Sequence, residues 1–295
     1  MAEDPPIRRS VLAAALAIVA ISALAWWLRP GEPEAQPPAA APGDALVLSA
    51  DAGVERRSAG GWTRARAGDA LEVTDSIRAG EGSTAEIALG RRTRITLAER
   101  SEVTVRELTA AAQRVGLVRG RIGVDVRPDG TRVLRVEDPS GTVVARGVSG
   151  RFGVVASGGG LAIAAAAGRV TVESAGRAVE VPEGAETVAW RGTAPLPPRP
   201  IPREVVLRVA RRIEERRASA CLVLHVDVAT ELLVNGEQVE VPADGTVVVH
   251  LPARTKRREV AVALRHAGGA VERRTLPCWE SEGDVSALEV KWNAR

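Results

Sequence analysis

The two cysteines are the residues of this sequence whose pairing could do covalent chemistry. Cys221 and Cys278 are the only cysteines among 295 residues, and they bracket a stretch of alternating apolar residues. Such a pair can form a disulfide, hold part of a metal site or act as a redox couple, but no Cys-x-x-Cys or His-x-x-x-His spacing accompanies it. In an oxidising compartment an isolated pair favours a disulfide. We predict a Cys221–Cys278 bridge, which stabilises the fold by about 4 kcal/mol on the chain-entropy model.

Catalytic chemistry needs a nucleophile, a base and an orienting group, and no spacing in this sequence indicates such a set. His225, His250 and His266 lie in or beside strand-like runs without any accompanying signature. The run Gly158-Gly159-Gly160 has no Lys and no helix pattern after it, so it predicts a turn and not a phosphate-binding loop. We therefore predict a protein that is not an enzyme, with no catalytic residues, no cofactor-binding residues and no metal ligands.

Composition favours β-sheets over helices. The apolar residues are chiefly Val, Ala and Leu, with one Phe (Phe152) and no Tyr, while 29 Gly and 18 Pro are spread along the chain. Val-rich sequences suit pleated sheets, and scattered Gly and Pro end many short elements. The net charge is +3, and the stretch Ile201–Ala218 alone carries six Arg against three Glu. A nucleic-acid binder is expected to spread basic residues over a folded face, so nucleic acid is not a predicted partner.

An apolar stretch near the N-terminus predicts a membrane anchor. Val11–Leu28 contains no charged residue and, as a helix that rises about 1.5 Å per residue, reaches roughly 27 Å, just enough for a hydrocarbon core. Arg8 and Arg9 precede it, and Trp26 and Trp27 end it at interfacial depth. The charge bias predicts a single span in a bacterial inner membrane, with the N-terminus in the cytoplasm and the bulk of the chain in the periplasm.

A cleaved signal peptide is the alternative interpretation of the same stretch. Ala23-Leu24-Ala25 has the small-x-small pattern of a cleavage site, and cleavage would release a secreted or periplasmic protein. In the anchored form, residues 1–10 are a short cytoplasmic tail, and the Pro-, Ala- and acid-rich residues 29–44 are an extended tether. Both interpretations export the remainder of the chain.

Residues 45–193 alternate in the manner of antiparallel β-strands. Every second residue is apolar or small in Ala85–Leu89, Arg94–Leu97 and Glu102–Arg106. The expected strands are Ala70–Val73, Ser83–Leu89, Thr93–Ala98, Glu102–Leu108, Gly116–Val126, Val133–Val136, Thr142–Val148, Gly153–Ala156, Leu161–Ala166, Arg169–Glu173, Ala178–Val181 and Glu186–Trp190.

Several motifs within residues 60–190 resemble the FecR domain. They are Gly68-Asp69-Ala70-Leu71, the turn Asp75–Gly80, the strand Ser83–Leu89, the glycine-interrupted run Leu117–Val126, and Asp138-Pro139-Ser140-Gly141 with Val144–Gly147. The sequence departs from the family's pattern at Gly90–Thr93 and at Gly147–Phe152, where turn tips differ.

The resemblance implies an envelope location and a β-rich recognition module. In the best-known members this domain is the periplasmic half of a transmembrane anti-sigma regulator, with a helical sigma-binding domain in the cytoplasm, and residues 1–10 are too short for such a domain. The leading hypothesis is therefore a membrane-anchored, non-catalytic binding or scaffold module for envelope proteins or polysaccharide. The alternative hypothesis is a transmembrane signalling regulator of the FecR anti-sigma type that lacks the usual cytoplasmic domain.

A linker and a second β domain follow. Residues 194–218 combine the Pro-rich run Pro195–Pro200 with apolar residues at helical spacing, which predicts an amphipathic helix over Pro202–Ala218. Its Arg-rich face fits either an anionic lipid or polysaccharide surface or simple solvation. Residues 219–295 predict a β-sandwich-like domain, similar to small immunoglobulin-like or PEGA-type modules, with a two-residue hairpin at Asn235-Gly236. The predicted fold class is thus all-β, with two antiparallel β domains, a linker with one helix, and an N-terminal transmembrane helix.

Overall fold

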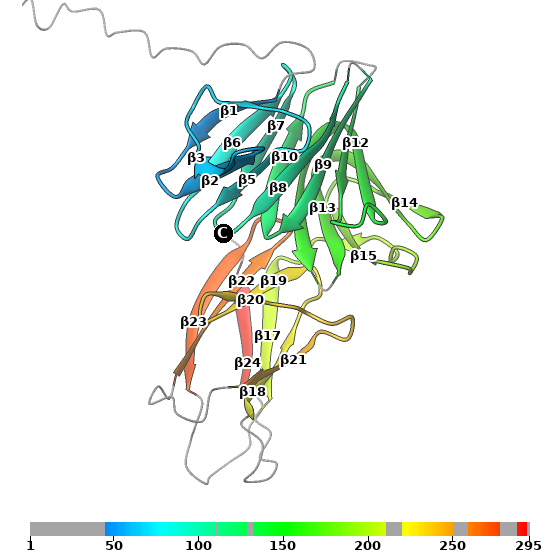
Figure 1. Ribbon diagram of the computed structural model, residues 1–295. Coiled ribbons are helices and arrows are strands. Elements are labelled where there is room, and N and C mark those ends of the chain that lie inside the picture. The colour runs from blue at the N-terminus through cyan, green and yellow to red at the C-terminus, as the bar shows by residue number, and fades with distance from the viewer. Residues whose placement is uncertain are drawn as a thin grey trace, which may run out of the picture. The chain divides into compact units, whose positions relative to one another are not determined.

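The computed structural model describes seven stretches of the chain, and these are built from strands without any helix (Figure 1). The stretches are residues 45–109, 111–128, 132–157, 159–210, 220–250, 259–277 and 288–293. The all-β prediction is confirmed for them, and together they belong to one compact unit. The predicted tail, membrane span and tether at residues 1–44 lie outside the described residues. In the described stretches, no helix has the length and apolar character needed to cross a bilayer.

The first sandwich, residues 45–200, has two layers of strands. One layer runs in the order β3 (Gly61–Arg64), β2 (Val54–Ser58), β5 (Ser76–Ala79), β8 (Glu102–Leu108), β9 (Ala112–Arg119) and β11 (Val133–Glu137). The other runs in the order β4 (Ala70–Leu71), β1 (Ala45–Ala50), β6 (Ala85–Leu89), β7 (Thr93–Leu97) and β10 (Arg121–Val126). The remaining strands are β12 (Val144–Ser157), β13 (Gly160–Ser174), β14 (Arg177–Val181), β15 (Ala185–Trp190) and β16 (Arg199–Pro200).

Two long strands belong to both layers. The first part of β12 pairs with β11 and its second part with β10, while β13 pairs with β15 at its start and with β14 at its end. The β12–β13 register shifts between Gly147 and Gly150, and Gly150 has a φ of 113°. A Cβ at Gly150 would lie 2.2 Å from the Ala167 carbonyl oxygen. Glycine is therefore required where the pair bends from one layer into the other.

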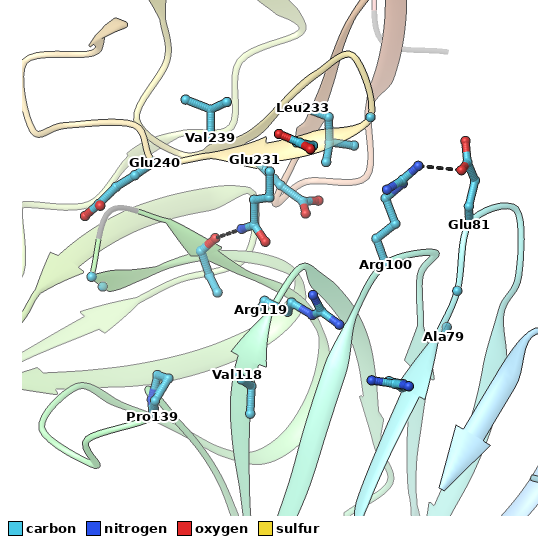
Figure 2. Close-up of a pocket in the computed structure, with 18 of the residues that line it drawn as sticks. Ala79, Glu81, Arg100, Val118, Arg119, Pro139, Glu231, Leu233, Val239 and Glu240 are labelled. Atoms are coloured by element: carbon cyan, nitrogen blue, oxygen red, sulfur yellow. Dashed lines mark hydrogen bonds and ion pairs between the residues drawn. The ribbon is translucent and has the colours of Figure 1, made fainter. Parts of the chain in front are cut away.

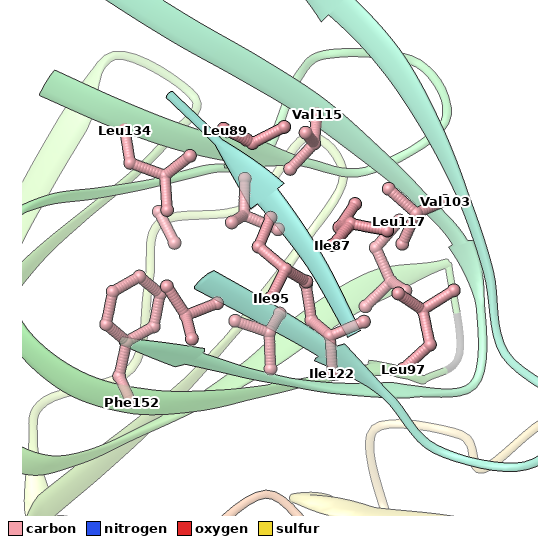
Figure 3. Close-up of a cluster of buried hydrophobic side chains, with 14 of the residues drawn as sticks. Ile87, Leu89, Ile95, Leu97, Val103, Val115, Leu117, Ile122, Leu134 and Phe152 are labelled. Atoms are coloured by element: carbon pink, nitrogen blue, oxygen red, sulfur yellow. The ribbon is translucent and has the colours of Figure 1, made fainter. Parts of the chain in front are cut away.

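The core of this sandwich lies between its two layers (Figure 3). Ile87 and Ile95 come from one layer, Val103 and Leu117 from the other, and all four side chains are fully buried. Phe152, the one phenylalanine, is buried in the same cluster. Alternation along each strand places these residues inward, and their burial supplies the main stabilisation of the layers.

One strand pair corrects the expectation of purely antiparallel sheets. β9 and β11 are parallel, with Arg114 opposite Arg135 and Val115 opposite Val136. The chain turns at Gly120, whose φ is 81°, and β10 then pairs in the other layer. Because β10 acts as the crossover, the chain returns beside β9 in the same direction. The expected strand Gly116–Val126 is for this reason two strands in different layers.

The predicted helix is wrong where the structure describes it. Glu204–Ala210 is strand β17, which lies between β18 (Ala220–Val226) and β24 (Leu288–Asn293). Leu207 and Val209 alternate inward and are buried. In so short a run the spacing of the valines fits the periodicity of a helix and that of a strand. Pairing with strands that are distant in sequence stabilises the strand. Residues 211–218 of the predicted helix lie outside the described residues.

The second sandwich consists of two four-stranded sheets. One has the order β21 (Thr246–His250), β18, β17, β24, and the other has the order β20 (Glu237–Val239), β19 (Thr230–Val234), β22 (Glu259–His266), β23 (Val271–Pro277). Leu207 and Leu224 of the first sheet share a buried cluster with Leu232 and Leu264 of the second. Asn235 and Gly236 have φ values of 51° and 84°, which confirms the predicted two-residue hairpin between β19 and β20.

A pair of facing glycines tests how closely the sandwiches approach. Gly123 and Gly153 are cross-strand partners in β10 and β12, but a Cβ at Gly153 would lie 2.0 Å from the Ala267 carbonyl oxygen of the second sandwich. A Cβ at Gly123 meets only Thr96, at 4.0 Å.

We expect Gly153→Ala to lower the free energy of unfolding by about 1–3 kcal/mol through overpacking. Gly123→Ala should be neutral or stabilise by up to about 1 kcal/mol. Thermal unfolding of the full-length variants measures both, and equal effects would contradict this account.

Candidate functional site: the cleft between the sandwiches

A small apolar patch joins the two sandwiches. Val155, Ala162 and Val188 of the first sandwich pack against Ala229 and Ala267 of the second, and all five are buried. Small side chains let the two backbones come close. Two clusters of charged residues flank this patch. β22 contributes Arg265 to one cluster and His266 to the other.

The Glu99 cluster consists of Glu99, Arg121, Glu231, Arg265 and Arg273. The Arg265 guanidinium donates to the Glu99 carbonyl oxygen at 2.7 Å, pairs with the Glu99 carboxylate at 2.9 Å and with the Glu231 carboxylate at 3.3 Å. The side chains of Arg265 and Glu231 are 3% and 0% exposed, whereas that of Arg273, which also binds Glu99, is 65% exposed. The cluster therefore places one buried ion pair at the boundary between the sandwiches.

The two carboxylates of this cluster are shifted in opposite directions. Burial raises the pKa of Glu231 above its ordinary value, although Arg265 and Arg121 act to lower it. Burial also acts to raise the pKa of Glu99, but the Gly82 N–H, Arg265 and Arg273 together lower it below its ordinary value. Desolvation and the nearby Arg265 guanidinium lower the pKa of Arg121. Glu231 consequently carries its charge at a cost in the folded state, whereas Glu99 gains from its charge.

The Glu186 cluster lies on the opposite side of β22 and consists of Glu186, Arg199, Asp227 and His266. Arg199 donates to one Glu186 carboxylate oxygen at 2.9 Å and also binds Asp227. The other Glu186 oxygen lies 3.0 Å from His266 Nε2, without a hydrogen bond of acceptable geometry. Glu186 and His266 are fully buried. Burial acts to lower the pKa of Arg199, but Asp227 and Glu186 raise it overall.

Donor atoms of Glu186, Asp227 and His266 lie within 4.8 Å of one another, which is close enough to consider a cation. The His266 ring argues against one. The Gly268 N–H donates to Nδ1 at 3.0 Å, so Nδ1 is an acceptor and the neutral ring carries its proton on Nε2. A metal would need the Nε2 lone pair, and Arg199 already forms ion pairs with both carboxylates. These residues fit an ion-pair cluster better than a metal site.

A cleft of about 910 Å³ opens between the sandwiches (Figure 2). Val118 and Arg119 of β9 stand on one side, and Leu233, Gln238 and Val239 of the β19–β20 hairpin stand on the other. At one end the Gln238 side-chain amide donates to the Ala156 carbonyl oxygen at 3.2 Å. The cleft is therefore lined by rigid strands and is crossed by a direct contact.

The two walls of the cleft differ in the charged residues that they present. The first sandwich contributes four arginines and two glutamates, namely Arg78, Arg100, Arg119, Arg191, Glu55 and Glu81, and the second contributes Glu231, Glu237 and Glu240. Glu81 pairs with Arg100 at 2.6 Å, and Glu55 pairs with Arg78 at 2.6 Å. The described residues that line the cleft include no imidazole, thiol, hydroxyl or amine. This arrangement of charged side chains on strands suits binding of a polar ligand.

Of the histidines, cysteines and glycine turn singled out from the sequence, only the glycine turn lines this cleft among the described residues. His225 lies exposed in β18, where its Nδ1 is 3.1 Å from the Thr246 hydroxyl, and His250 ends β21. Gly159 lies in the predicted turn between β12 and β13 and lines the cleft. Cys221 lies in β18, but Cys278 is outside the described residues, so the disulfide stays a prediction.

The sequence interpretation did not identify either charged cluster. The members of the Glu186 cluster come from β15, β16, the β18–β19 turn and the end of β22, and no motif links these segments. One usable signal was present: Arg265-His266 follows directly on the alternating apolar run of β22. Two charged or polar residues at the end of a buried strand need hydrogen-bond or ion-pair partners, which another element has to supply.

Comparison with known proteins supports the FecR resemblance. Residues 75–171 match the family model described as FecR protein, within the 60–190 stretch identified from the motifs. None of the curated proteins matches the chain. Two crystal structures of a putative anti-sigma factor from Parabacteroides distasonis ATCC 8503 are similar, at 16% identity and a TM-score of 0.37. The similarity covers 42% of this chain and 59% of that protein's chain.

Two arginines that share the Glu99 carboxylate test the role of the buried ion pair. We expect Arg265→Met to lower the free energy of unfolding by about 3–5 kcal/mol, because it leaves Glu231 buried without its counter-charge. Arg273→Met removes an exposed partner and should cost less than about 1 kcal/mol. Urea unfolding of the full-length chain measures the difference. Two equally mild variants would show that Glu231 does not depend on Arg265 as its counter-charge.

The opposite pKa shifts of Glu231 and Glu99 give opposite pH signatures. The folded pKa of Glu231 is raised, so its stabilising contribution is complete below the ordinary value of 4.5 and is lost as pH rises through the folded pKa. The folded pKa of Glu99 is lowered, so its contribution is present above 4.5 and is lost as pH falls through the folded pKa. Relative to wild type, Glu231→Gln should gain stability as pH rises from 4.5 towards neutrality. Relative to wild type, Glu99→Gln should lose stability as pH rises from strongly acid values towards 4.5. Unfolding temperatures measured across pH test both slopes, and parallel curves would contradict the assignment.

Proposed function

We propose that the chain is a non-catalytic regulator of the FecR type, whose β unit binds an envelope partner and passes that event across the membrane. The observation that carries the proposal is the FecR match over residues 75–171. This segment contains Val118, Arg119 and Pro139 and thus much of one wall of the cleft. In the best-known proteins with this domain, it is the periplasmic half of a transmembrane anti-sigma regulator.

The same resemblance supports an envelope location. We propose that the β unit lies in the bacterial periplasm and that residues 11–28 hold it to the inner membrane. A regulator must keep this span, whereas cleavage after Ala23-Leu24-Ala25 would release the β unit and end any coupling to the cytoplasm. Retention of residues 1–27 in the mature protein is therefore a requirement of this proposal and not of a secreted binding module.

An extended segment of a protein is the ligand that we propose for the cleft. Glu237, Gln238 and Val239 of β20 line it, and β20 is the last strand of its sheet among the described residues. A terminal strand can pair with an extended peptide through its main chain, and side-chain pockets then give specificity. The arginines of one wall and the glutamates of the other can bind acidic and basic side chains of the same segment. A polysaccharide would use the walls but not the strand edge, so a protein partner fits better.

Two exposed valines of similar accessibility test this function. Val118, which is 39% exposed, lines the cleft, whereas Val248, which is 46% exposed, lies on β21 and does not. In a strain that lacks the gene for this protein, the wild-type chain and Val248→Glu should restore the transcript levels that the deletion changes. Val118→Glu should fail at equal protein abundance, because it puts a larger, charged side chain beside Arg119 on the wall opposite Glu231 and Glu237, where it repels acidic groups and blocks the cleft.

The readouts separate the regulator from the scaffold hypothesis. Crosslinking from a probe at Gln238 reports the partner, and crosslinking from residues 1–10 reports a cytoplasmic contact. The scaffold hypothesis is favoured if Val118→Glu loses the Gln238 crosslink and if no transcript level depends on the protein. If Val118→Glu behaves like Val248→Glu in both assays, the cleft is not the functional site.

A further inference from the structure

Three arginines stand side by side on one face of the first sandwich, away from the cleft. The strand register places Arg114 of β9 opposite Arg135 of β11, and Arg135 opposite Arg146 of β12. Directly opposed residues point to the same face, and neighbouring strands lie about 4.8 Å apart. Arg114, Arg135 and Arg146, here called the arginine row, therefore bring three positive charges together across about 10 Å. Like charges in this position repel one another unless other groups compensate them.

The outer members of the arginine row have carboxylate partners. Arg114 pairs with Glu137 at 2.8 Å and with Glu107 at 3.5 Å, and Arg146 pairs with Glu173. The hydrogen bond to Glu137 is the largest cause that raises the pKa of Arg114. Glu137 is also shared, because Arg106 binds its second oxygen at 2.9 Å.

Arg135, the central member, has no carboxylate partner among the described residues. Its Nε is buried and makes no hydrogen bond, and the same holds for the Nε of Arg146. Arg106 and the arginine row together hold one more guanidinium than the three carboxylates around them. The excess positive charge therefore lies at the centre of the row, between two other cations.

The surroundings of Arg135 favour an oxyanion over further protein contacts. Thr171 of β13 is the cross-strand partner of Arg146 and adds a hydroxyl to the end of the row. Val144 and Val148 lie two residues before and two residues after Arg146 on β12. Val144 is half-buried, and Val148 is 51% exposed. All of these residues stand on paired strands, so the guanidinium groups are positioned before any ligand arrives.

We propose that Arg114, Arg135 and Arg146 form a binding site for a ligand that carries two or more phosphate groups. Guanidinium groups bind phosphate through paired N–H donors. A phosphate monoester carries roughly −1.5 to −2 charges at neutral pH and three acceptor oxygens, so it competes with the single charges of Glu137 and Glu173 better than a carboxylate does. One phosphate contacts Arg135, and a second reaches Arg114 or Arg146. The site lies within the FecR-matching residues but does not depend on the function proposed for the cleft.

Tripolyphosphate binding to the full-length chain tests this proposal. The unfolding temperature is measured against tripolyphosphate concentration at constant ionic strength. Wild type should show a saturable rise. Arg135→Gln should unfold at a higher temperature than wild type without ligand, since the repulsion is relieved, and should bind at least about tenfold more weakly. Arg135→Lys keeps the charge but loses the paired donors, so its affinity should lie between these two.

Arg64→Gln is the matched control. Arg64 lies exposed on β3, at the opposite end of the layer that contains β9 and β11, and its replacement removes the same charge at a distance from the row. Binding by this variant should equal that of wild type. Equal shifts in wild type, Arg135→Gln and Arg64→Gln would mean general electrostatic binding and would overturn the proposal, as would the absence of any shift in wild type.

Soluble glycerophosphoglycerol distinguishes a free polyphosphate from a lipid headgroup as the source of the phosphate. It carries a single phosphodiester with one charge, so we expect it not to shift the unfolding temperature. A saturable shift with glycerophosphoglycerol that Arg135→Gln abolishes, without a tripolyphosphate response, would overturn the multiple-phosphate ligand in favour of a membrane lipid headgroup.

Discussion

The arrangement of the whole β unit depends on two neighbouring residues at the end of β22. Arg265 and His266 point to opposite sides of this strand, so one enters the Glu99 cluster and the other enters the Glu186 cluster. Between these clusters lies an apolar patch whose buried members are Ala and Val. Charged residues fix the approach of the sandwiches because each charge is satisfied at one relative position. The width of the cleft follows from that position.

The two proposed binding sites use the same strands in different ways. At its end β9 presents Val118 and Arg119 to the cleft, where acidic residues face it from the second sandwich. Further back along the same strand, Arg114 stands in the arginine row, which holds an excess of positive charge over the carboxylates around it. The cleft is therefore suited to a ligand of mixed charge, whereas the arginine row is suited to one of purely negative charge.

The sequence predicted local elements well and their partners poorly. Strict alternation placed Glu102–Leu108 at the bounds of β8, and Asn235-Gly236 identified its hairpin, because both signals reside in a few adjacent residues. The valines of β17 satisfy two periodicities, so only β18 and β24 decide their structure. The arginine row and both charged clusters arise from strand register and the crossover through β10, and no spacing along the chain encodes either.

The sharing of β12 and β13 between two layers limits how this protein can be recombined with others. The FecR-matching segment ends at Thr171, inside β13, and it omits β1, β2 and β3, which complete the layers. A chimera cut at these limits would carry half-paired strands and exposed sheet edges, which invite aggregation. A transplantable module has to extend from β1 to β16, so the paired set of strands is wider than the stretch that matches the family model.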